Sequence, residues 1–249
     1  MRDGEPSGTA RHVAAYRVGF DRPPVAFGDP EAEDRLARDV AAGTEIDPTA
    51  RIADYLRART SFFDRVVLSA LDSATTQVAV IGAGYDARAL RYAKPGVRWF
   101  EVDHPATQRD KRQRLDRLAI ATPGITFVAA DLAEEDISTV LPRAGFRPGT
   151  PSLLLCEGLA VYLAPAVLAR LLAGLRSIAT PDTRLAISTG IPGIDPARRA
   201  QFAARVAALG EPAALADADI GALLTAAQWR PAELPEPDQR VGVILAIPA

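Results

Sequence analysis

The stretch from Gln77 to Arg88, which reads QVAVIGAGYDAR, decides the fold. Its first half is a short run of the residue types that favour β-strands, and Gly82-Ala83-Gly84 ends that run. Because glycine has no Cβ, this turn lets the backbone change direction sharply and lets a ligand come close to the chain. The stretch therefore predicts a strand over 77–81, a ligand-binding turn, and a helix over 86–93.

Strand-like runs and helical patterns alternate from this stretch to the end of the chain. Helices of about 10 to 15 residues between strands indicate βαβ units, and therefore an α/β fold with a doubly wound, mostly parallel sheet. The first 75 residues read as helical, and a proline-rich turn precedes the last strand, which closes the sheet in a hairpin-like way. The expected strands are 77–81, 97–102, 125–129, 152–156, 184–188 and 240–247, and the expected helices are 7–20, 30–41, 48–72, 86–93, 105–121, 134–141, 165–179, 196–209 and 220–228.

Composition excludes several classes of protein. With 249 residues, 29 basic against 31 acidic side chains and a pI near 5.8, the chain suits one globular domain and argues against a nucleic-acid partner. No apolar run predicts a membrane span or a signal peptide, so we expect a cytoplasmic protein. One cysteine, Cys156, and two histidines offer little for a disulfide or a metal site. We therefore expect no metal, and chemistry that depends on a bound organic molecule.

The glycine turn alone also fits a dinucleotide-binding protein. It reads G-x-G-x-x-A, and Asp103 follows Gly84 by 19 residues, the spacing of an acid that binds a ribose hydroxyl. However, Asp86 places a carboxylate where a helix N-terminus would hold a pyrophosphate. An acid at this point suits a cationic or zwitterionic ligand better than NAD.

Carboxylates follow the next two predicted strands. Glu101 and Asp103 share one face of a strand end, because strand side chains alternate. Asp103 is the first choice for a ribose ligand and Glu101 the second, although either residue could instead cap the next helix. Asp131 could accept from an adenine amino group and Leu132 could cover its ring, but a helix-capping role for Asp131 is equally open.

Glu157 emerges from the buried strand predicted over 152–156, so it needs a cationic partner or hydrogen-bond donors. Such a carboxylate suits an ammonium or a sulfonium, and Tyr162 is close enough in sequence to face the same cavity. Upstream, Arg59 is a candidate to bind a carboxylate, whereas Arg57 suits a solvated helix face better.

Together these motifs resemble the leucine carboxyl methyltransferase family, in its bacterial branch of S-adenosylmethionine-dependent O-methyltransferases. Five stretches carry the resemblance in family order: 57–64, 80–88, 101–108, 131–132 and 157–163. One departure is Ala87, which stands where the family usually has threonine.

The resemblance implies a Rossmann-like class I methyltransferase domain with a seven-stranded sheet and S-adenosylmethionine (SAM) as its cofactor. It divides the chain into a helical N-terminal cap (1–75), a cofactor-binding core (76–190), a helical lid (191–230) and a final strand (231–249). It also implies roles for the residues singled out above. Arg59 would hold the SAM carboxylate and Glu157 would lie near its amino group, with Gly82, Gly84 and Asp86 around the methionine portion. Asp103, with Glu101 as second choice, would bind the ribose, Asp131 and Leu132 the adenine, and Tyr162 would face the methyl acceptor.

The expected reaction is transfer of the methyl group to the carboxylate of a small molecule. A carboxylic acid is already ionised at neutral pH, so this reaction needs no general base and suits a chain poor in histidine. Methylation of a small-molecule carboxylate is typical of specialised metabolism. Two alternatives are an NAD-dependent oxidoreductase and a non-catalytic SAM-binding module. The sequence indicates neither the acceptor nor the oligomeric state.

Overall fold

A single seven-stranded sheet organises the protein. The computed structural model describes residues 4–47, 49–190, 195–208, 219–232 and 242–249. The strand order is β3-β2-β1-β4-β5-β7-β6; strands β1 to β5 pair in parallel, and β7 runs antiparallel to both β5 and β6. The strands are β1 (Gln77–Ile81), β2 (Arg98–Asp103), β3 (Ile125–Ala129), β4 (Ser152–Cys156), β5 (Arg184–Gly190), β6 (Trp229–Pro231) and β7 (Gly242–Pro248). The predicted doubly wound, mostly parallel sheet is confirmed.

The helices occur where the apolar periodicity predicts them, with shorter ends. Helix α2 has the predicted bounds because Asp29 caps it and Pro30 is its first residue. The described helices are α1 (Gly8–Arg17), α2 (Pro30–Ala41), α3 (Arg51–Leu71), α4 (Arg88–Arg91), α5 (Pro105–Arg117), α6 (Ile137–Arg143), α7 (Pro165–Ser177), α8 (Pro196–Ala208) and α9 (Ile220–Ala226), with a 3-10 turn, η1 (Ala160–Tyr162).

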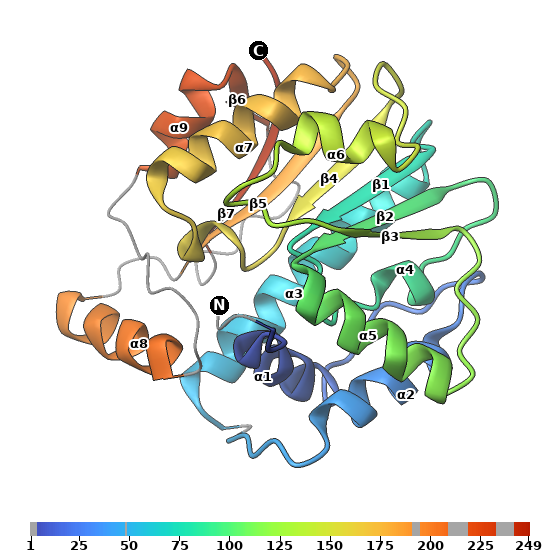
Figure 1. The fold of residues 1–249 in the computed structure, drawn as a ribbon, viewed down its shortest axis with the longest axis vertical. Coiled ribbons are helices and arrows are strands. Elements are labelled where there is room, and N and C mark those ends of the chain that lie inside the picture. Colours follow the sequence, from blue (N-terminus) through green and yellow to red (C-terminus); the bar gives the residue numbers. More distant parts are fainter. Residues whose placement is uncertain (1–3, 48, 191–194, 209–218, 233–241) are drawn as a thin grey trace.

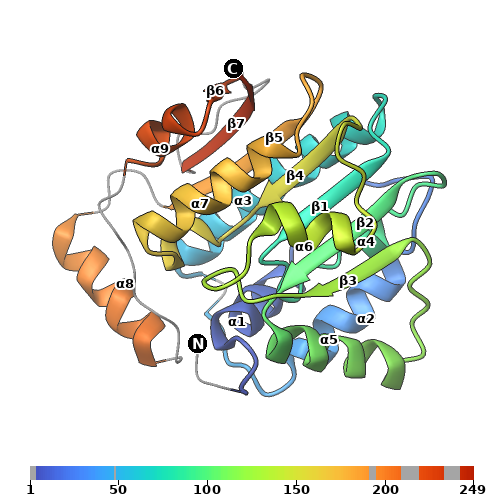
Figure 2. The same cartoon turned by 45° about the horizontal axis from the view of Figure 1, so that its top comes forward.

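Helices cover both faces of the sheet, as Figures 1 and 2 show. On one face α6, α7 and α9 pack against the strands, and on the other α3 and α4 do so. Successive residues of a strand go to opposite faces: Ile81 and Leu154 join the first cluster, whereas Val80 and Leu155 join the second. Because helices cover both of these faces, the buried strands read as continuous apolar runs.

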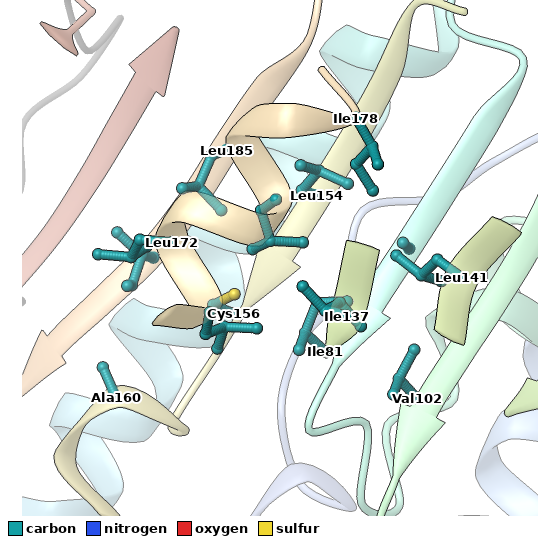
Figure 3. Packing of buried hydrophobic residues seen from close by; sticks show 14 of the residues in the cluster. Ile81, Val102, Ile137, Leu141, Leu154, Cys156, Ala160, Leu172, Ile178 and Leu185 are labelled. Carbon is teal, nitrogen blue, oxygen red and sulfur yellow. The ribbon is translucent and has the colours of Figure 1, made fainter. Parts of the chain in front are cut away.

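The core between the sheet and helices α6 and α7 is shown in Figure 3. Ile81, Val102 and Leu154 from the strands meet Ile137 of α6 and Leu172 of α7, all of them fully or almost fully buried. Cys156 lies in the same cluster, and burial raises the pKa of its thiol to about 12. This core holds α6 and α7 against the sheet.

The C-terminal region contains a strand that the sequence prediction placed in the lid. Trp229 begins β6, and its indole Nε1 donates to Leu172 O at 3.0 Å, which ties this strand to α7. Of the region expected as a lid, 191–194 and 209–218 lie outside the described residues. Within the described part of the chain, no helix has the length and apolar character needed to cross a membrane.

Candidate functional site

The glycine turn after β1 lies between α1 and the segment that follows β4. Gly82 and Gly84 have φ values of +70° and +51°, a backbone region that favours glycine. A Cβ on Gly82 would come within 2.9 Å of the Leu159 side chain, and one on Gly84 within 2.9 Å of the Ala10 Cβ. The turn therefore needs glycine for its conformation and for the close approach of its neighbours.

Asp103, the last residue of β2, is held against this turn. Its Oδ2 accepts from Gly84 N at 2.5 Å and its Oδ1 accepts from His104 N at 2.7 Å. Burial raises the pKa of Asp103 to about 6, although these two backbone amides and nearby cations act against the rise. Each carboxylate oxygen keeps a lone pair for a further donor.

Glu101, the other acid of this strand end, has a partner within the protein. It is 2% exposed, and its Oε2 accepts from Lys111 Nζ of α5 at 2.5 Å. Burial raises the pKa of Glu101, and the Lys111 ammonium opposes this rise. The two acids that the sequence predicted on one face thus differ in how far their oxygens are already used.

Asp131 lies in the open, at the end of β3. Its side chain is 45% exposed, and its Oδ1 accepts from Ala133 N at 2.9 Å. His104 approaches it with Nε2 at 4.0 Å from Asp131 Oδ2, while the His104 Nδ1 accepts from Ala106 N at the start of α5. Leu132 is partly buried against the core.

Glu157, directly after β4, is buried among three arginines. Its Oε1 accepts from Arg17 Nη2 at 2.7 Å and from Arg59 Nε at 2.9 Å, and its Oε2 accepts from Arg88 Nη1 at 2.6 Å. Burial alone would raise the pKa of Glu157, but the three guanidinium groups outweigh it and hold this pKa well below its usual range. Glu157 is therefore a fixed negative charge.

Asp86 is bound to its own helix start. Its Oδ1 accepts from Arg88 N at 2.8 Å, its Oδ2 accepts from the Arg88 guanidinium, and Arg17 Nη1 lies 3.5 Å away. The helix that follows, α4, has only four residues. Asp86 thus takes the backbone donor of Arg88 and places a negative charge at this helix start, where a pyrophosphate would meet repulsion.

Arg88, the partner of Asp86, also binds residues of α3. It is 1% exposed, its Nε donates to Asp64 Oδ1 at 2.7 Å, and its Nη2 donates to Thr60 O at 3.2 Å. Asp64 also binds Arg22, which donates to Glu33, and Glu33 accepts in turn from Arg91. We call this set the arginine–carboxylate cluster: Arg17, Arg22, Arg59, Arg88, Arg91, Glu33, Asp64, Asp86 and Glu157.

Tyr162 ends η1, five residues after Glu157, and is half-buried. Between them, Gly158 N donates to Ser188 Oγ at 2.7 Å, which ties the end of β4 to that of β5. The structure thus places Arg59, Glu157 and Asp86 in one cluster and Asp103 on the glycine turn, while Asp131 lies apart from the cluster. Arg17 and Arg88, which sequence reasoning missed, complete the surroundings of Glu157; the demand of a buried strand-end acid for cations was the signal that pointed to them.

The fold is that of the Rossmann-like methyltransferases. Three solved structures share the fold: a putative methyltransferase from Thermobifida fusca (TM-score 0.66, 20% identity, 99% of this chain and 96% of that one), a DUF574 family protein from Streptomyces avermitilis (0.64, 19%, 99% and 99%), and the magnesium protoporphyrin IX methyltransferase from Synechocystis with bound SAH (0.55, 15%, 86% and 93%).

The family is also shown at the level of sequence. The sequence model of the family described as "Leucine carboxyl methyltransferase" matches residues 23–176. Two relatives named "Putative S-adenosyl-L-methionine-dependent methyltransferase" come from Mycobacterium avium (34% identity over 232 residues, 82% of this chain and 72% of the relative) and Mycobacterium sp. (36% over 201 residues, 72% and 65%). The chain belongs to the leucine carboxyl methyltransferase family, and its expected cofactor class, SAM, is confirmed at that level. It spans about two thirds of the length of these curated relatives.

Proposed function

We propose that this protein is a SAM-dependent O-methyltransferase that forms the methyl ester of a small-molecule carboxylic acid. The fold and the family support a methyltransferase, and the state of the acids and bases at the strand ends supports this kind of acceptor. The acid must reach the site with its nucleophilic oxygen already ionised.

The observation that carries the proposal is that the titratable groups named next are either bound by other groups of the protein or held protonated. Three guanidinium groups hold Glu157 in its ionised form, and Asp86 is bound to Arg88. The His104 Nδ1 accepts at the start of α5, and burial raises the pKa of the Cys156 thiol to about 12. A phenol or alcohol acceptor would need a group to accept its proton, and Asp103, the strand-end acid whose oxygens keep free lone pairs, is assigned to the ribose. A carboxylate, with an ordinary pKa near 4, needs no such group.

The residues present fit the methionine portion of the cofactor. Arg59 and Glu157 form a neighbouring pair of opposite charges, with Arg59 Nε 2.9 Å from Glu157 Oε1, and such a pair suits a group that bears both a carboxylate and an ammonium. Arg59 would hold the carboxylate and Glu157 would lie near the amino group. When bound, SAM supplies an electrophilic methyl group on a positively charged sulfur. Gly82 and Gly84 would flank this portion through their backbone, and Asp86 would lie near it as the partner of Arg88.

The residues at the ends of β2 and β3 fit the adenosine portion. We assign the ribose to Asp103, since its carboxylate is oriented by Gly84 N and keeps free lone pairs, whereas Glu101 is already bound by Lys111. Asp131 would accept from the adenine amino group, and Leu132 would cover the ring. Tyr162, on η1 beside Glu157, would face the acceptor.

In this arrangement the protein positions the acceptor and excludes water, and does no acid–base chemistry of its own. Holding two reactants in line lowers a barrier by about 7 to 11 kcal/mol in well-oriented systems. We therefore expect Tyr162→Phe to change the KM for the acceptor, by roughly 3- to 10-fold for one lost hydrogen bond, and to leave the affinity for SAM unchanged. An unchanged acceptor KM in this variant would remove Tyr162 from the acceptor site.

The proposal is tested with SAM carrying a labelled methyl group. The protein is incubated with a panel of small carboxylic acids and a matched panel of phenols. We expect the label in the methyl ester of one of the acids. Mild base should release this label as methanol, because esters hydrolyse under these conditions and aryl ethers do not. Base-stable label would contradict the carboxylate assignment. Binding of SAM in calorimetry with no transfer to either panel would favour the binding-module alternative.

A further inference from the structure

Three different parts of the chain contact the side chain of Arg59, the residue assigned to the cofactor carboxylate. Its Nε donates to Glu157 Oε1 at 2.9 Å, its Cζ lies over the Tyr55 ring at 5.4 Å from the ring centroid, and the Gly158 backbone packs against its guanidinium. Both Arg59 and Tyr55 are buried. Because a free arginine side chain adopts many rotamers, these contacts confine the guanidinium to one orientation.

The contact with Tyr55 follows from the helix that carries both residues. Tyr55 and Arg59 are four positions apart on α3, so their side chains lie on the same face, one turn apart. Long side chains on a helix lean toward its N-terminus, which brings the Arg59 guanidinium back over Tyr55. Tyr55 in turn packs in an apolar cluster that includes Tyr16 of α1 and Val243 of β7. The ring is therefore a fixed surface for the guanidinium.

Gly158 gives the guanidinium a second fixed surface. A Cβ on Gly158 would come within 3.3 Å of both Nη1 and Nη2 of Arg59 and within 3.4 Å of its Cζ. The near equality of these distances puts that point over the plane of the guanidinium and not at its edge. The Gly158 N–H donates to Ser188 Oγ at 2.7 Å, and Ser188 is buried, so this backbone is held in place.

These contacts decide how Arg59 can meet a carboxylate. Glu157 takes Nε, and the Gly158 backbone covers a face of the guanidinium, so a carboxylate would bind in its plane through Nη1 and Nη2. Two parallel hydrogen bonds in one plane are the strong geometry for an arginine–carboxylate pair. This geometry requires that the plane of the guanidinium has the correct tilt, and the ring of Tyr55 is the surface that sets this tilt.

We propose that Tyr55 is a positioning residue of the cofactor site, whose ring holds the plane of the Arg59 guanidinium for the carboxylate of the methionine portion. This inference rests on the proposed function, in which Arg59 binds that carboxylate. Tyr55 acts through Arg59, so its effect is confined to ligands that carry the carboxylate.

The test compares SAH with 5′-methylthioadenosine, which keeps the adenosine and the sulfur but lacks the amino-acid part. Calorimetry measures both affinities. Tyr55→Leu should weaken SAH about 3- to 10-fold, the value of a desolvated cation–ring contact, and should change the affinity for 5′-methylthioadenosine by less than about twofold. Leucine favours a helix at least as well as tyrosine, so α3 should keep its structure. Damage to the fold would weaken both ligands alike.

Two further variants separate the ring from its surroundings. Tyr55→Phe keeps the ring and should keep the wild-type affinity for both ligands. Tyr16→Leu makes the same replacement as Tyr55→Leu in the same apolar cluster, and the ratio of the two affinities should stay at its wild-type value.

Arg59→Met separates this inference from the proposed function. It should weaken SAH at least about tenfold, as expected for the loss of hydrogen bonds between charged groups, and leave 5′-methylthioadenosine unchanged. Adding Tyr55→Leu to Arg59→Met should weaken SAH no further, because a residue that acts through Arg59 has no effect without it.

The outcomes that contradict the two assignments differ. An unchanged affinity for SAH in Arg59→Met would remove Arg59 from the cofactor site, and the role of Tyr55 with it. If Arg59→Met behaves as expected, the role of Tyr55 alone is overturned by any of three results. They are a loss in Tyr55→Leu that is absent or equal for the two ligands, the same loss of SAH in Tyr55→Phe as in Tyr55→Leu, and an undiminished further loss in the double variant.

Discussion

Glu157 and Asp131 both lie within two residues of the end of a parallel strand, β4 and β3, yet their surroundings are opposite. Glu157 is buried and bound by three arginines, whereas Asp131 is 45% exposed and accepts from one backbone amide of its own loop. β4 is central in the sheet and packs against α3, while β3 is an edge strand. Position in the sheet thus decides whether an acid near a strand end becomes part of a buried charge cluster or stays exposed to solvent.

The largest expected effect is the loss of Arg88. Arg88→Met leaves Asp64, Asp86 and Glu157 buried without the guanidinium that joins them, and removing one partner of a buried ion pair costs about 3–5 kcal/mol. We expect the free energy of unfolding in urea to fall by this amount. Arg57→Met serves as the control, because Arg57 is 48% exposed in a surface pair with Asp54 and its loss should cost less than about 1 kcal/mol. Equal stability of the two variants would show that the cluster does not hold this edge of the sheet together.

Asp103 is intermediate between Glu157 and Asp131, since it is half-buried and accepts from two backbone amides. Asp103→Ala should weaken SAH by about 10- to 100-fold, the value of hydrogen bonds to a charged group. Asp116→Ala, an exposed acid on α5, should leave the affinity unchanged. Calorimetry with SAH measures both, and wild-type affinity in Asp103→Ala would remove this residue from the ribose site.

The sequence predicts the sheet well because its signals are local. β1, β3 and β4 occur at their predicted bounds, since each is an apolar run that a turn interrupts. The contrast between two neighbouring arginines was also predictable from helical spacing: Arg57 is exposed, and Arg59 is buried. Local patterns therefore suffice for the buried parallel strands and for the face of a helix on which a residue lies, whereas the short strand β6 carries no such pattern.

The charge cluster is not local, and for that reason it escaped prediction. Arg17 reaches Glu157 across 140 positions of sequence, and Arg88 reaches it across 69. Lys111 neutralises Glu101 from the next helix, ten residues away. Sequence showed that a buried acid needs cations, but only packing selects which arginines among many supply them.

A change of pH tests whether the ionised form of Asp103 is the one that binds the cofactor. Its pKa is raised to about 6, so the carboxylate is ionised above pH 6 and takes up a proton as pH falls through 6. If ribose hydroxyls donate to the ionised form, the affinity for SAH should fall about tenfold between pH 7.5 and pH 5. Asp103→Asn should bind more weakly and show no such dependence. A wild-type affinity that is constant over this range would show that the ionised form of Asp103 is not required.

The smallest effect is expected at the exposed end of β3. Asp131→Asn keeps an acceptor oxygen and removes a charge that water already screens, so the free energy of unfolding should change by less than about 0.5 kcal/mol. The affinity for SAH should fall only about 2- to 5-fold, because a hydrogen bond at an exposed site competes with water. Adenosine is the sharper probe, since it lacks the methionine portion that we propose for the Glu157 side of the site. If Asp131 contacts the adenine, Asp131→Asn should weaken the binding of adenosine and of SAH by the same factor. An effect on SAH alone would place Asp131 away from the adenine.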